Sequence, residues 1–292
     1  MSKKVRTHTA KAPELIGREG EMQQIRACLK AGRNVLLEGP VGVGKTHLAL
    51  AVTREFKAEV FRVDGDNRYS EQKLAGWFDP PMVIKKGYGK SSFVPGPLVE
   101  AMLKGGVLFI NELNRLPEGV QNVLLPAVDE RMIVVPRLGV VHAKPGFKVI
   151  ATQNPKEFVA TSHLSEAILD RFELVILDYQ SEEDEIAIVR GRLVPGADRN
   201  LAVAAVKLAR LTREHPRVRR GASIRAAISV AEIAAVLMAE GLKLETAFLA
   251  AVLMALPTRI EIEREADNER SMRAEIESLL KEWVDQVLKK KT

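Results

Sequence analysis

A glycine-rich stretch ending in Lys45 and Thr46 has the composition and spacing of a phosphate-binding loop. It fits the pattern G-x-x-x-x-G-K-[ST] and follows the apolar run Asn34–Leu37, which we expect to form a strand. Glycines let the backbone N–H groups turn towards phosphate oxygens, and the next helix presents its positive N-terminal end. Lys45 is expected to contact the β- and γ-phosphates and Thr46 to hold Mg²⁺. The nucleotide-contacting residues predicted here are Gly39, Pro40, Val41, Gly42, Val43, Gly44, Lys45, Thr46 and His47.

Two polar residues, Asn111 and Glu112, end a second apolar run, Val107–Ile110. Ligands of open α/β sheets bind beyond the carboxyl ends of the strands, so we expect this pair beside the phosphate loop. Hydrolysis needs one residue in the magnesium shell, here Asn111, and another to orient or deprotonate water, here Glu112. An amide carries no charge, so magnesium affinity is expected to be weaker than with a carboxylate. The alternative is that the pair merely ends a strand.

Three further residues are candidates for the same chemistry. Asn154 follows the run Phe147–Ala151, a position suited to place an amide between the γ-phosphate and water. Arginine is the side chain best suited to charge that develops on a transferring phosphoryl group. Arg171 and Arg225 are the candidates, although by composition alone either could equally be an ordinary surface arginine.

The elements that position these residues alternate between apolar strands and helical patterns. This alternation predicts an α/β fold, a five-stranded parallel sheet with helices on both faces. After Tyr179 the pattern changes to a helix-start signal at Ser181–Asp184 and alanine- and leucine-rich helices, which predicts a second, all-helical domain. The expected division is an N-terminal arm at 1–13, a nucleotide-binding domain at 14–179 and a helical domain at 180–292 with a charged C-terminal helix. The predicted strands are Asn34–Leu37, Val60–Val63, Val107–Ile110, Phe147–Ala151 and Leu174–Leu177.

Two insertions interrupt the α/β part. Residues 79–94 lie between a helical stretch expected to end near Trp77 and a helix expected to begin near Pro97, and they are predicted to form a projecting loop. Residues 132–142 hold two β-branched runs around a Pro-Arg-Leu-Gly segment, which predicts a hairpin. Loops of this kind are more often functional than structural.

Composition excludes several classes of protein. The longest apolar run, Ala247–Leu256, is too short to span a membrane, and the polar start lacks a signal-peptide core, which favours a cytoplasmic protein. A single cysteine, Cys28, excludes an internal disulfide and a multi-cysteine zinc site. The formal charge of +6 comes from 44 basic and 38 acidic residues that are largely interspersed, so it favours a nucleic-acid partner only slightly.

Six segments in this order resemble the motifs of AAA+ ATPases of the MoxR family, and the similarity spans residues 14 to about 260. Asn111 departs from the family pattern, which normally has Asp there. The segments are Leu15–Glu19, Leu36–Pro40, Pro95–Leu98, Asn111–Arg115, Ala151–Pro155 and Leu169–Phe172.

The resemblance implies roles that composition does not give. It implies that Asn154 is sensor 1, that Arg171 is an arginine finger reaching a neighbouring subunit's nucleotide, and that Arg225 is sensor 2. Arg115 is a rival candidate for the finger. Adenine contacts are implied for Leu15, Ile16 and Gly17. The insertions at 79–94 and 132–142 resemble the helix-2 insert and the pre-sensor-1 hairpin, which face the central pore of a ring in relatives.

Three functions remain open from the sequence. The favoured one is a homo-oligomeric ATPase, implied to be a hexameric ring, that binds ATP and Mg²⁺ and remodels a partner protein, as MoxR-like relatives do, often one with a von Willebrand A domain. A DNA-directed motor or loader is permitted by the basic cluster at Lys85–Lys90, although no known DNA-binding module is evident. A nucleotide-gated switch that barely hydrolyses ATP is suggested by Asn111.

Overall fold

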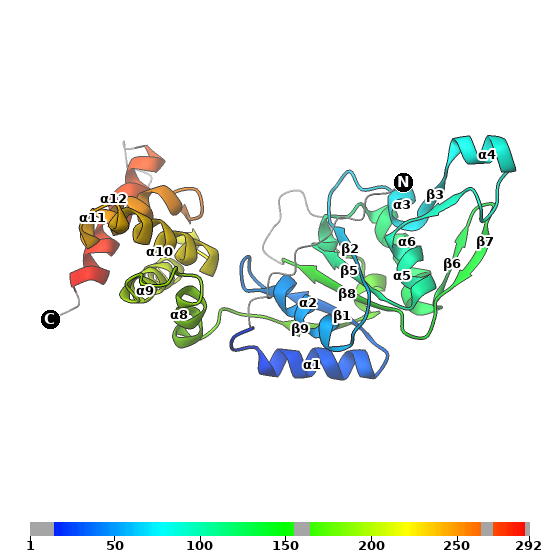
Figure 1. The fold of residues 1–292 in the computed structure, drawn as a ribbon, viewed down its shortest axis with the longest axis horizontal. Coiled ribbons are helices and arrows are strands. Elements are labelled where there is room, and N and C mark those ends of the chain that lie inside the picture. The colour runs from blue at the N-terminus through cyan, green and yellow to red at the C-terminus, as the bar shows by residue number, and fades with distance from the viewer. Residues whose placement is uncertain (1–14, 155–163, 264–270, 290–292) are drawn as a thin grey trace.

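The computed structural model describes residues 15–154, 164–263 and 271–289. The predicted N-terminal arm at 1–13 and the end of the Ala151–Pro155 motif, Pro155, lie outside these residues. In Figure 1 a sheet domain is joined to a helical domain by the segment that follows strand β9.

The sheet domain is built on five parallel strands in the order β2-β5-β8-β1-β9, which confirms the predicted α/β fold. β8 lies between β1, which leads to the phosphate loop, and β5, which ends at Asn111. The last strand begins two residues earlier than predicted because Phe172 already pairs with Asn34. The strands are β1 Asn34–Glu38, β2 Val60–Asp64, β5 Val107–Asn111, β8 Lys148–Gln153 and β9 Phe172–Ile176.

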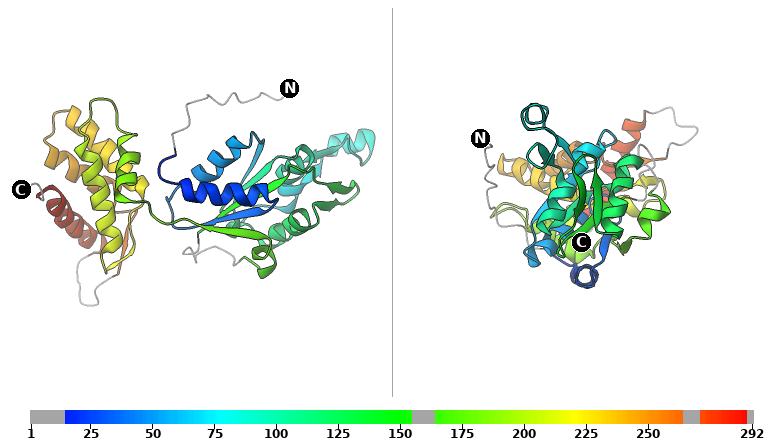
Figure 2. Two further views of the ribbon diagram at one scale, coloured as in Figure 1. Left: turned by 90° about the horizontal axis from the view of Figure 1, so that it is seen from below. Right: turned by 90° about the vertical axis from the view of Figure 1, so that its right-hand side faces the viewer.

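Alternating side chains of these strands bury apolar residues on both faces of the sheet. Helices cover both faces (Figure 2). Leu37 and Phe109 face the helices α1 (Glu19–Lys30) and α2 (Lys45–Glu55). Leu36 and Leu108 pack with residues of α3, α5 and α6 on the opposite face. Those three helices span Glu71–Ala75, Pro97–Lys104 and Glu118–Asp129, and the short helices η1 and α7 span Leu113–Arg115 and Glu166–Leu169.

The first insertion differs from the loop that the sequence predicts. Trp77 lies in a strand, β3 (Gly76–Phe78), which pairs antiparallel with β4 (Phe93–Pro95). Between them lies helix α4 (Pro80–Lys86), started by two prolines whose fixed φ suits a first helical turn. The prediction of irregular structure was wrong because the short apolar run around Trp77 does not reveal whether it is helix or strand.

The second insertion is the predicted hairpin, β6 (Met132–Val135) paired with β7 (Gly139–His142). Both insertions project from the same end of the sheet domain in Figures 1 and 2.

The C-terminal domain is mainly helical, with one apolar core formed by its helices. It also contains a two-stranded ladder, β10 (Val218–Arg220) with β11 (Glu261–Ile262), that the sequence analysis did not anticipate. The charged C-terminal helix packs on this core through Trp283 and Leu280. The helices are α8 Glu182–Arg190, α9 Asn200–Glu214, α10 Ile224–Ala239, α11 Leu244–Ala255 and α12 Met272–Lys289. No helix among the described residues has the length and apolar composition to cross a membrane.

Candidate nucleotide site

The predicted phosphate loop occupies residues 39–44, between the end of β1 and the start of α2. Gly44 has a φ of 93° and Gly42 a φ of 86°, conformations that L side chains rarely adopt. A side chain at position 42 would also collide with Ser223 of the helical domain. The Lys45 ammonium donates hydrogen bonds to the carbonyl oxygens of Gly39 and Pro40, at 2.5 and 2.8 Å, so its charge lies within the loop.

Asn111 lies at the end of β5, beside the phosphate-loop helix. The Thr46 hydroxyl donates to Asn111 Oδ1 at 3.1 Å, and the Thr152 hydroxyl donates to the same oxygen at 3.2 Å. Thr152 Oγ1 in turn accepts the backbone N–H of Glu112 at 2.9 Å. The structure therefore brings together the residues predicted to serve the metal and the water, and it adds a threonine that the sequence analysis did not select.

Glu112 has a left-handed backbone conformation, with φ and ψ both 59°. This conformation is uncommon outside glycine and recurs at functional sites. Its carboxylate forms an ion pair at 2.9 Å with Arg115, the last residue of η1. The rival arginine-finger candidate thus contacts the predicted catalytic base of its own chain.

Asn154 follows directly after β8 and is buried, with 6% of its surface exposed. Its backbone carbonyl accepts a hydrogen bond from Asn114 Nδ2 at 3.4 Å, which connects the end of β8 to the segment after β5. On the other side of β8, Gln153 donates to the Glu38 carboxylate at the end of β1. The three strand ends that carry the predicted site are thereby joined.

Arg171 lies at the opposite end of the sheet. It precedes Phe172, which pairs with Asn34 at the amino end of β1, whereas the phosphate loop follows the carboxyl end. Four residue steps along a strand separate those ends by about 13 Å. Arg171 donates to Asp129 of α6 at 2.7 Å, which holds it at the end of the sheet away from its own phosphate loop.

The segment predicted to contact adenine is held by the residues that link the two domains. Gln180 Nε2 donates to the carbonyl oxygens of Ile16 and Gly17, at 2.5 and 3.2 Å. The buried Arg18 guanidinium donates to Val43 O of the phosphate loop at 3.0 Å and to Asp178 O of the linker at 2.6 Å. Leu15 packs against the core beside α1 and α2.

Arg225 is the second residue of α10 and is exposed. Partial burial, and then the positive charges of Arg192, Arg225 and Arg54, lower the pKa of His47 in α2. The start of α10 lies beside the phosphate loop, because a side chain at Gly42 would meet Ser223, two residues before Arg225.

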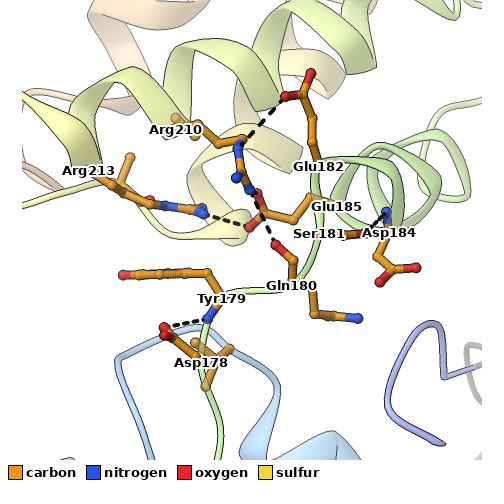
Figure 3. Close-up of polar contacts among 12 residues, drawn as sticks. Asp178, Tyr179, Gln180, Ser181, Glu182, Asp184, Glu185, Arg210 and Arg213 are labelled. Atoms are coloured by element: carbon orange, nitrogen blue, oxygen red, sulfur yellow. Dashed lines mark hydrogen bonds and ion pairs between the residues drawn. The ribbon is translucent and has the colours of Figure 1, made fainter.

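The start of the helical domain is fixed by an ionic cluster, shown in Figure 3. The buried Glu185 carboxylate accepts from Arg213 at 2.8 Å and from Arg210 at 3.3 Å. The Arg213 guanidinium also lies 3.8 Å from the ring centroid of Tyr179 in the linker. Ser181 caps α8 by accepting the N–H of Asp184, as the capping signal predicts. The linker is therefore anchored on both domains.

The donors around Thr46 and Asn111 fit a magnesium ion that shares its shell with nucleotide phosphates. A hydroxyl and an amide oxygen converge at 3.1 Å, and Mg²⁺ in such sites keeps water and phosphate as its other ligands. Among the described residues no cluster of three or more His, Cys, Asp or Glu forms a metal site of its own.

Comparison with known proteins shows the family to which the chain belongs. Residues 34–172 match the model of the AAA domain of the dynein-related subfamily. Over 270 residues the chain is 30% identical to gas vesicle ATPase GvpN1 of Halobacterium salinarum, covering 86% of this chain and 75% of that one. The chain belongs to the AAA+ ATPases of the dynein-related, MoxR-like type. It is also 32% identical over 225 residues to gas vesicle ATPase GvpN of Haloferax mediterranei, covering 72% of this chain and 64%, just under two thirds, of that relative.

Solved structures share the AAA+ fold at lower identity. A Thermotoga maritima RuvB mutant matches 82% of this chain and 71% of its own, with a TM-score of 0.55 and 20% identity. A Cytophaga hutchinsonii structure covers 95% of this chain and 91% of its own, with a TM-score of 0.50 and 21% identity.

Proposed function

We propose that this AAA+ chain is a magnesium-dependent ATPase that works as a homo-oligomeric ring, a hexamer, and uses hydrolysis to remodel a partner protein. In this proposal Lys45 binds the β- and γ-phosphates, Glu112 accepts a proton from the attacking water and Asn154 orients that water. Mg²⁺, when bound, neutralises charge on the phosphates, and Thr46 and Asn111 hold it. The names of the two haloarchaeal relatives support ATP hydrolysis.

The ring is supported by the position of Arg171. Because this arginine lies at the far end of the sheet from its own phosphate loop, its predicted role as a finger requires a neighbouring subunit. Its ion pair with Asp129 would hold the guanidinium at a fixed place on that edge of the sheet domain.

The observation that carries the remodelling proposal is the joined pair of insertions. The Arg137 guanidinium at the hairpin turn lies 4.0 Å from the centroid of the Tyr88 ring, and Tyr88 packs edge-on against Phe78. The two insertions therefore form a single projection, in which Ile84 is 87% exposed and Trp77 46%. Exposed apolar side chains on a projecting element are typical of protein-binding sites. Leu138 of the same hairpin packs instead against the core.

The experiment uses ATP-bound chain as bait. Glu112→Gln, which should hold ATP without turnover, is used to capture partners in the native cell, with Glu112→Gln/Ile84→Asp as the matched control. Each protein lost in the control is purified and added to the wild-type chain, starting with any von Willebrand A domain protein, the partner class that the resemblance implies. The expected result is stimulated turnover in the wild type and none in Ile84→Asp, with equal basal rates. Equal stimulation of both would contradict a role for the projection.

A DNA-directed motor is the second candidate, because the exposed Lys85, Lys86 and Lys90 lie on the same projection. Turnover is measured with single- and double-stranded DNA at low and moderate salt. Counterion release makes phosphate contacts strongly salt-dependent. Salt-sensitive stimulation that disappears when the three lysines are changed to glutamine would replace the protein-remodelling proposal with this one.

A slow nucleotide-gated switch is the third candidate, favoured by the uncharged Asn111. Its signature would be nucleotide-dependent assembly with almost no steady-state turnover, with or without a partner.

A further inference from the structure

We propose that the buried hydroxyl of Thr152 determines which end of the Asn111 amide faces the metal. Thr152 would then be a positioning residue for magnesium-dependent nucleotide binding, an inference that rests on the proposed function. Register places the two residues side by side, because Ile110 of β5 pairs with Ala151 of β8. Thr152 is fully buried, with 0% of its surface exposed, so bulk water has no access to substitute for its hydroxyl.

The hydrogen bonds of this hydroxyl fix where its proton points. Thr152 Oγ1 accepts the Glu112 backbone N–H at 2.9 Å, which uses one lone pair. A hydroxyl has only one proton to donate, and here it is directed to Asn111 Oδ1 at 3.2 Å. Two hydroxyls, from Thr152 and Thr46, thus converge on the same amide oxygen.

This arrangement matters because an amide has two different ends. The carbonyl oxygen can accept the Thr46 hydroxyl, as it does here, which leaves a lone pair of Thr46 Oγ1 for Mg²⁺, whereas the amino group would donate to that lone pair instead. The two ends have nearly the same size, so hydrogen bonds decide which way the side chain turns. A carboxylate has two equivalent oxygens and needs no such selection. The requirement for Thr152 is therefore specific to a chain with Asn at position 111.

The test is a double-mutant cycle between the two positions. Thr152→Val removes the hydroxyl at nearly constant volume, and it leaves the Glu112 N–H without its acceptor whether position 111 is Asn or Asp. Any purely structural cost is therefore equal in both backgrounds and cancels in the cycle. Thr152→Ser retains the hydroxyl and is the conservative control. Thermal unfolding of each variant verifies that it is folded.

The measured quantity is binding of a fluorescent, non-hydrolysable ATP analogue as Mg²⁺ is titrated from an EDTA baseline. We expect Thr152→Val to raise the half-maximal Mg²⁺ concentration about tenfold, the size of one hydrogen bond's contribution. Thr152→Ser should remain within about twofold of wild type, and Asn111→Asp/Thr152→Val within about twofold of Asn111→Asp, because neither pair differs in a required orienting bond.

The outcomes separate this inference from the proposed function. If Thr152→Val shifts the magnesium titration equally in the wild-type and Asn111→Asp backgrounds, the orienting role is overturned and Thr152 is reduced to structural support. Wild-type binding that does not respond to Mg²⁺ would overturn the proposed magnesium dependence itself, and the inference with it.

Discussion

Thr46 Oγ1 and Asn111 Oδ1 lie 3.1 Å apart, joining the phosphate-loop helix to the end of β5. A negative charge introduced at position 111 would therefore lie next to the cation that Thr46 is proposed to hold. Asn111→Asp is predicted to lower the Mg²⁺ concentration needed for ATP binding by about fivefold or more, since two unit charges about 4 Å apart attract by roughly 1 kcal/mol even in water. Asn34→Asp, at the opposite end of the sheet, is the matched control. An unchanged magnesium titration would place Asn111 outside the metal shell.

Lys45 supplies the positive charge within the phosphate loop, and its ammonium already lies against the loop carbonyls. Lys45→Ala is predicted to weaken ATP binding at least tenfold, because a hydrogen bond to a charged group contributes roughly 1.5–3 kcal/mol. Isothermal titration with ATP and Mg²⁺ measures the affinity for ATP. Lys30→Ala, a substitution at an exposed position, should bind ATP as the wild type does. Equal affinities for all three proteins would refute the assignment of the loop.

Arg171 forms an ion pair with Asp129. Substituting each partner in turn distinguishes a catalytic role of the arginine from a structural one. A finger acting on a neighbour predicts that Arg171→Ala loses turnover by about 10³-fold or more while ATP still binds. Asp129→Asn breaks the same ion pair but keeps the arginine, so it should retain most of the turnover.

Mixing two inactive variants provides a second test of the proposed role of Arg171 as a finger. Rings containing both Arg171→Ala and Lys45→Ala chains should regain some hydrolysis, because some interfaces then combine an intact finger with an intact loop. No recovery in rings shown to be mixed, together with an Asp129→Asn variant as inactive as Arg171→Ala, would indicate that the arginine acts only through its ion pair.

Glu185 and Glu182 both contact Arg210, but only Glu185 is buried. Glu185→Ala is predicted to lower the free energy of unfolding by about 3 kcal/mol, because it leaves the Arg213 guanidinium, whose side chain is only 10% exposed, without its carboxylate. Glu182→Ala, at the partly exposed 3.9 Å contact, should cost less than about 1 kcal/mol. Urea unfolding of both variants checks the difference, and similar values would mean that the cluster in Figure 3 does not stabilise the helical domain.

Much of the fold and the centre of the site could be predicted because their signals are local in sequence. The pattern around Lys45 and the polar pair after Val107–Ile110 each depend on a few consecutive residues, and the parallel sheet then brings strand ends together. Arg18 and Gln180 gave no such signal. Their partners, Asp178 and Ile16, lie 160 and 164 residues away, and only tertiary structure reveals those contacts.

Thr152 lies between these two cases, because the sequence shows the residue but not its contacts. Thr152 directly follows the apolar residues Val149–Ala151 of β8, and a hydroxyl buried in such a strand needs hydrogen-bond partners. Which partners it finds depends on the register of β8 against β5, which the sequence does not contain. The β3–β4 pair around α4 was missed for a related reason, since three-residue strands carry too little periodicity to identify.

The most direct test of the central claim is steady-state phosphate release from ATP by the purified chain, compared with Glu112→Gln. We predict measurable magnesium-dependent turnover in the wild type and a loss of at least about 100-fold in the variant, because an amide cannot accept the proton of the attacking water. ATP binding by the variant, measured in parallel, should be unchanged, and Glu118→Gln at the exposed start of α6 should hydrolyse ATP as the wild type does. Equal turnover by the wild type and Glu112→Gln would contradict the account.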